Sequence, residues 1–192
     1  MVEKNDLMKE VIKRAEELII GERKDVFRPL FEIANQKGQE IAAKLNADKT
    51  IVLLGTMFMD VARSKAEAEG RVQDHSVMSV EVVKKFLSNF DLNQDFKEKV
   101  YNCVGAHHED IPFTCLEAEI CANADCYKFL HPKGLFGFIG TSVVHRGFDV
   151  SLKIALSKIE EKHAVLSLDI CKQELEPYYN HIKLLLTDAV KE

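Results

Sequence analysis

Residues 42–63 read AAKLNADKTIVLLGTMFMDVAR and contain the most apolar run of the chain. Asp48 is a residue type that caps helix N-termini, and apolar side chains then follow at nearly every position of 51–54. This pattern predicts a helix over 48–62, and a helix without a polar face has to be surrounded by protein. We expect it to be the most buried element, with Asp60 close to its end.

The helical period of about 3.6 residues recurs along the rest of the chain, and no stretch alternates strictly enough to indicate a strand. The sequence therefore predicts an all-α fold, a single helical bundle of about seven or eight helices. The charged stretch 63–73 is predicted as a loop or a frayed helix end, and the glycine-rich stretch 131–140 as an irregular connection. The helices are expected near 6–20, 25–45, 48–62, 74–87, 94–106, 114–130, 147–163 and 168–190.

Length and composition fit one domain of 192 residues, of which 46% are hydrophobic. The formal net charge of −5 argues against binding nucleic acid or an anionic membrane through bulk charge, although it leaves room for a small basic phosphate pocket. We expect no membrane span and no signal peptide, because charges interrupt every apolar run. The five cysteines form no CxxC pair, which favours buried thiols in a reducing cytoplasm.

Acids and histidines gather at the edges of the apolar helices, in an order that suits a metal ion held by several helices of a bundle. Each of these residues also has an explanation that involves no metal ion. An aspartate at the end of a buried helix can pair with Arg63, and a histidine after Asp74 can belong to a surface pair. A histidine doublet can complement a helix dipole, and an aspartate in an apolar helix can bond an amide or an arginine. The candidate ligands are Asp60, His75, His107 with its neighbour His108, and Asp125.

These segments together resemble the HD superfamily of metal-dependent phosphohydrolases. In 42–63, Met59-Asp60 stands where the family has its His-Asp doublet, and Arg63 stands where a basic residue follows. The stretches DHSVMSVEVV, CVGAHHED and ANADCYKFL resemble the segments that carry the family's next two histidines and its late aspartate. The resemblance covers about 27–130, and it implies a single HD-like domain over 1–192 with helical extensions at 1–26 and 131–192.

The departures from the family pattern fall on one half of the implied metal site. The family's first histidine would fall near Leu30, and the doublet histidine is Met59, whose thioether is a poor ligand for hard cations. The ligands implied for the other half are all present, and we expect any ion to lie on their side of Asp60. The resemblance implies Mn, Fe, Mg, Ni or Zn, and one ion would suffice for Asp60, His75 and His107, with His108 as an alternative.

Two functions follow from the resemblance. The first is a metal-dependent phosphohydrolase acting on a small phosphate ester or a nucleotide, with Asp60 and Arg63 as catalytic residues. Lys65 or Arg71 would help Arg63 to hold the phosphate. The second is a catalytically inactive domain that keeps the fold to bind a ligand or another protein. A third and weaker reading is a purely structural helical domain.

Overall fold

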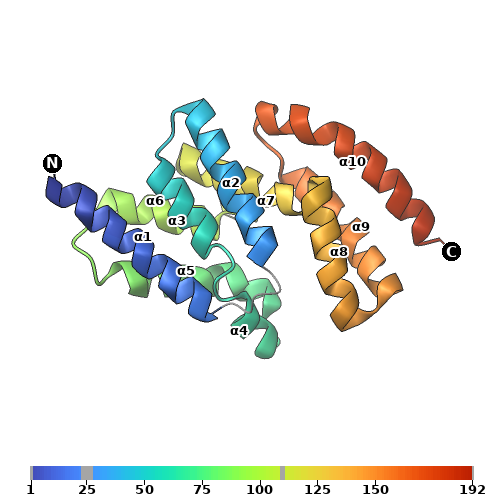
Figure 1. Cartoon of the computed structure of the whole chain (residues 1–192), viewed down its shortest axis with the longest axis horizontal. Helices are drawn as coiled ribbons and strands as arrows, with labels where there is room; N and C mark the ends of the chain where they lie inside the picture. The colour runs from blue at the N-terminus through green and yellow to red at the C-terminus, as the bar shows by residue number, and fades with distance from the viewer. Residues whose placement is uncertain (1, 23–27, 109–110, 192) are drawn as a thin grey trace.

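The computed structural model describes residues 2–22, 28–108 and 111–191, which form helices, turns and loops and contain no β-strand (Figure 1). The predicted all-α fold class is therefore confirmed. The helices are α1 (Val2–Glu22), α2 (Arg28–Leu45), α3 (Lys49–Phe58), α4 (Arg63–Ala68), the 3-10 turn η2 (Val72–Asp74), α5 (His75–Leu87), α6 (Gln94–Gly105), α7 (Leu116–Leu130), α8 (Pro132–Arg146), α9 (Phe148–Val165) and α10 (Asp169–Ala189).

Helices α3 and α7 form the centre of the molecule. Helix α3 packs against α2, α6 and α7, while α7 also contacts α8, α9 and α10. Gly55 lets α3 approach its neighbours closely, because a Cβ there would lie 2.5 Å from Cys103 Cβ and 2.6 Å from Cys121 Sγ. The stretch 48–62, which was expected to be the most buried element, shares this position with α7, because eleven of fifteen residues are buried in each.

Eight predicted helices are present, and two further helices, α4 and α8, begin in stretches that were predicted as a loop or frayed helix end and as an irregular connection. Helix α4 is supported by ion pairs four residues apart, such as Arg63–Glu67 at 3.5 Å, and by the buried Ala66. Helix α8 begins with Pro132, a favoured first residue, and runs through three glycines. A Cβ at Gly134 would lie 2.5 Å from the carbonyl oxygen of Tyr127, so glycine is required where α8 packs on the end of α7.

The N-terminal and C-terminal helices lie at opposite ends of the molecule (Figure 1). Helix α1 contacts α3, whereas α8 and α9 contact α7. The predicted start of the second helix near Asp25 lies outside the described residues, and α2 is described from Arg28. Among the described helices, none has a stretch long and apolar enough to cross a membrane.

Candidate metal centre

The turns that follow α3 and α6 and the start of α5 carry the candidate ligands. Asp60 lies in the turn 59–62 directly after α3, and His75 is the first residue of α5. His107 and His108 lie in the turn after α6. Residues that are far apart in the sequence are therefore presented from three chain segments to one place.

The three imidazoles converge, and the carboxylate of Asp60 joins them. His75 Nε2 lies 3.3 Å from His107 Nε2 and 3.2 Å from His108 Nε2. Asp60 Oδ1 lies 3.3 Å from His75 Nε2 and 3.9 Å from His107 Nε2. Candidate donor atoms of the three histidines all lie within 4.8 Å of one another. The structure thus brings together Asp60, His75, His107 and the alternative residue His108.

Backbone carbonyls fix the tautomers of two of these imidazoles. His75 Nδ1 lies 2.7 Å from Val72 O, and His107 Nδ1 lies 2.7 Å from Val104 O. A carbonyl oxygen can only accept, so each Nδ1 carries a proton, and in the neutral ring each Nε2 presents a lone pair. Two buried lone pairs that face each other across 3.3 Å lack a proton between them. This is the arrangement that a metal ion would satisfy, and the residues present fit one.

Burial keeps two of the imidazoles neutral. Burial lowers the pKa of His107 to about 4, against the opposing attraction of Asp60. Burial, followed by the charge of His107, lowers the pKa of His108 to about 2. A histidine must be neutral to bind a metal, so both side chains are in the ligand form at neutral pH.

Asp125 is joined to this cluster through lysines. Lys128 Nζ lies 2.7 Å from Asp60 Oδ2 and 2.5 Å from Asp125 Oδ1, and Lys162 Nζ lies 2.8 Å from Asp125 Oδ2. Burial alone would raise the pKa of Asp60, but the Lys128 ammonium holds it well below its usual value. The pKa of Asp125 is lowered in the same way by Lys128 and Lys162. The prediction that Asp125 shares one cluster with the histidines needs this correction, because two ammonium groups occupy its carboxylate.

Neither lysine was singled out from the sequence. Lys128 stands three residues after Asp125 on α7, and this spacing places the two side chains on one face of a helix. That signal could have identified Lys128. Lys162 comes from α9, and no local pattern connects it to Asp125.

A pocket opens next to Asp60 on the side away from the imidazoles. Arg63 lines it but does not pair with Asp60 as one alternative expected, because Lys128 takes that place and Arg63 Nε lies 3.5 Å from Glu67. Four of the lining side chains are cationic and two are acidic, while the rest are mostly aromatic or aliphatic. The lining residues are Leu30, Phe31, Asp60, Arg63, Ser64, Glu67, Lys128, Phe129, Phe138, Arg146, Ile154 and Lys158.

Comparison with known proteins identifies the family. The sequence profile of the HD domain matches residues 34–130, which is half of the chain and contains every candidate ligand. The chain belongs to the HD domain family. Ribonuclease Y of Treponema denticola is 32% identical over 92 residues, or 48% of this chain, and the chain spans 16% of the length of that relative.

The HD fold extends beyond the matched segment. The crystal structure of a predicted HD superfamily hydrolase from an uncultured Thermotogales bacterium is similar with a TM-score of 0.63. The match covers 93% of this chain and 91% of that one at 14% identity, which establishes a shared fold only. Because the coverage exceeds the HD segment, helices outside 34–130 also have counterparts there.

Proposed function

We propose that this HD domain is a phosphohydrolase that binds one divalent metal ion and acts on a small phosphate ester or a nucleotide. Asp60, His75 and His107 would hold the ion, with His108 as an additional or alternative ligand. The observation that carries the proposal is the set of facing Nε2 lone pairs beside Asp60, next to a cationic pocket. A purely structural role for the histidines would not require the Nε2 lone pairs of His75 and His107 to face each other.

The donor set narrows the choice of ion. Three imidazoles and one carboxylate suit Fe, Ni or Zn, and Mn to a lesser degree, whereas Mg prefers oxygen ligands. Such an ion would polarise a phosphoryl oxygen and lower the pKa of water. Asp60 would be catalytic in this scheme because its Oδ1 holds the ion and its side chain reaches the pocket.

The pocket supports a phosphate-bearing substrate with an apolar part. Arg63, Arg146 and Lys158 provide positive charge, and a guanidinium can contact two phosphate oxygens at once. The three phenylalanines of the lining offer faces on which a flat ring can stack. Arg63 is the catalytic candidate among the cations because it follows Asp60 by three residues and lines the same pocket.

The test uses the full chain purified without a nickel column. We expect about one metal ion per chain by elemental analysis, and hydrolysis of a phosphomonoester or nucleotide that a chelator abolishes and Mn²⁺ restores. A short RNA belongs in the panel because one relative is named a ribonuclease. Metal uptake without any hydrolysis would favour the inactive ligand-binding domain instead. A chain that takes up no Mn²⁺, Fe²⁺, Ni²⁺ or Zn²⁺ near neutral pH would refute the proposed centre.

A further inference from the structure

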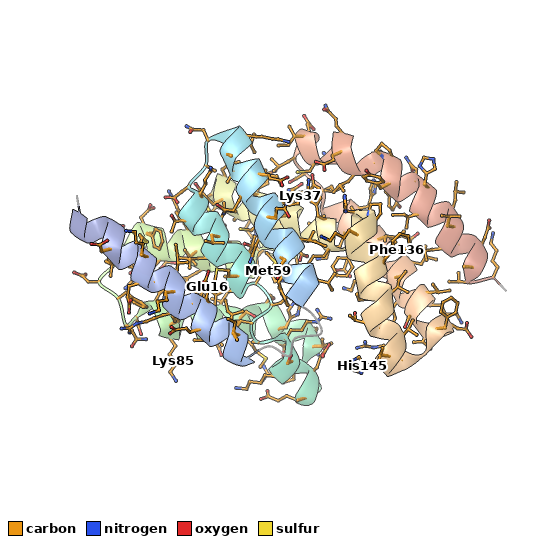
Figure 2. All side chains as sticks on the ribbon, viewed as in Figure 1. Glu16, Lys37, Met59, Lys85, Phe136 and His145 are labelled. Atoms are coloured by element: carbon orange, nitrogen blue, oxygen red, sulfur yellow. The ribbon has the colours of Figure 1, made fainter. Side chains whose placement is uncertain are left out.

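Lys128 is a buried cation at the heart of the site, with 4% of its surface exposed. Its Nζ donates a hydrogen bond to Asp60 Oδ2 and pairs with Asp125 Oδ1. The same atom lies 4.0 Å from Met59 Sδ, and Met59 is fully buried near the centre of Figure 2. A lysine is seldom buried so deeply unless its charge is matched, and here two carboxylates match it.

The surroundings of Lys128 Nζ have the form of a cation site. Two buried carboxylates from different elements, the turn after α3 and helix α7, converge on one atom. Two carboxylates that contact the same atom repel each other, so both stay ionised only with a cation between them. Among the described residues, Met59 Sδ at 4.0 Å and the ring of Phe31 at 5.3 Å also lie near Nζ, and neither is a hard donor.

The oxygens of the two carboxylates are divided in a way that leaves no room for a second metal ion. Asp60 Oδ2 accepts from Lys128, while Oδ1 faces His75. Asp125 gives one oxygen to Lys128 and the other to Lys162, which is 2% exposed. Only Asp60 Oδ1 is directed at the imidazoles, so a single ion can be held there without displacing an ammonium group.

We propose that the ammonium group of Lys128 permanently takes the place of a metal ion between Asp60 and Asp125. The centre then holds one ion at most, on the imidazole side of Asp60. The presence of that one ion rests on the proposed function, whereas the role of Lys128 does not. Lys128 is a positioning residue for Asp60, and it presents a fixed positive charge to the pocket that it lines.

An ammonium group in place of a metal ion changes how the pocket can interact with an anionic ligand. An ammonium group carries one positive charge and donates hydrogen bonds, but it provides no Lewis acidity. A phosphate entering the pocket would therefore be attracted by Lys128 together with Arg63, Arg146 and Lys158. Activation of the phosphate by coordination would have to come from the imidazole side.

The test is the Mn²⁺ stoichiometry of the full chain, measured by equilibrium dialysis and elemental analysis. The variants are Lys128→Ala and Lys128→Ala/Met59→His, and the control is Lys158→Ala, which removes another cation of the same pocket. We expect both Lys128 variants to bind one ion more than the wild type, and the double variant to bind it at least tenfold more tightly. The Lys158→Ala control should bind the same number of Mn²⁺ ions as the wild type.

The difference between variant and wild type tests Lys128, and the absolute wild-type value tests the proposed function. A wild type that binds no ion, with variants that bind one, would support the role of Lys128 and contradict the imidazole site. A wild type that binds two ions, or variants that bind no additional ion, would overturn the role of Lys128. If Lys128→Ala does not fold, Lys128→Gln replaces it with the same expectation. The number of Mn²⁺ ions that the wild type binds tests the proposal even without a variant, because two ions would overturn it.

Discussion

At the scale of single residues, the chemistry of the site is divided by one carboxylate. Asp60 Oδ1 faces His75 and His107, and Oδ2 accepts from Lys128. The first oxygen is available to a metal ion, and the second is neutralised within the protein. This division separates the residues that would hold an ion from those that would attract a phosphate.

The neighbouring residues His107 and His108 differ in burial, so we expect them to contribute differently to metal binding. His107 is fully buried with its tautomer fixed by Val104 O, whereas His108 is partly exposed. We expect His107→Ala to weaken Mn²⁺ binding by more than about tenfold, since even outer-shell partners are worth 10–100-fold. His108→Ala should have the smaller effect. Isothermal titration calorimetry measures both, and His145→Ala, on the exposed α8 position labelled in Figure 2, is the control.

An equal loss in His108→Ala would make His108 a ligand beside His107, and a larger loss would make it the ligand in place of His107. An unchanged affinity in both variants would place the ion elsewhere.

The ion pair between Asp125 and Lys162 should contribute strongly to stability. Asp125→Ala leaves the ammonium of Lys162 buried, and among the described residues Glu161 at 3.5 Å is then its remaining ion-pair partner. Leaving a buried charge unpaired costs about 3–5 kcal/mol. Urea unfolding should show this loss at pH 7. The lowered pKa of Asp125 makes its contribution complete above about pH 4 and lost as the pH falls further.

Two comparisons distinguish this pair from a surface pair. Asp125→Ala/Lys162→Met should lose less than the sum of the single losses, because it removes both charges. Asp6→Asn, in the exposed pair with Lys9, should change stability by less than about 0.5 kcal/mol. Additive losses in the double variant would show that the two charges do not depend on each other.

At the scale of elements, the sequence predicted helices well where one face had to be buried. The run at 51–54 and the cap Asp48, whose side chain accepts from Thr50 N and Ile51 N, located α3. Helices α4 and α8 were not predicted as helices, because the local sequence of both stretches is typical of a loop. Charge is dense in α4 and glycine is frequent in α8, yet α4 is stabilised by ion pairs four residues apart, and α8 by its packing against α7 and α9.

The contact between α3 and its neighbours should be intolerant of added volume. Gly55→Ala would place a Cβ against Cys103 and Cys121, so we expect a loss of about 1–3 kcal/mol in urea unfolding. Gly140→Ala is the matched control in α8, because a Cβ there meets nothing within 4 Å. That variant should be stabilising by about 0.5–1 kcal/mol, since alanine favours a helix. Similar effects at both positions would contradict the close packing of α3.

At the scale of the whole molecule, the pocket is built from both the HD segment and the helices that follow it. Asp60 and Arg63 lie within 34–130, while Arg146 and Lys158 come from α8 and α9 outside it. The sequence placed the candidate ligands in the HD segment, and it assigned the C-terminal helices no part in the site. Their contribution depends on how α8 and α9 pack beside α7, which only the folded chain determines.

The HD segment thus supplies the candidate metal ligands, whereas α8 and α9 supply cations of the pocket wall. Removing positive charge from the C-terminal wall should weaken ligand binding without affecting the metal, because no candidate metal ligand lies on α8 or α9. For Arg146→Gln/Lys158→Gln we expect the Kd of a nucleoside monophosphate to rise about three- to tenfold, which is up to about 1.4 kcal/mol. The modest value reflects the exposure of Arg146 and the pairing of Lys158 with Glu161. The Kd for Mn²⁺ should stay unchanged, and Lys153→Gln, an exposed cation of α9, should alter neither constant. A double variant that binds the nucleotide as tightly as the wild type would remove the C-terminal helices from the site and confine recognition to Arg63 and Lys128.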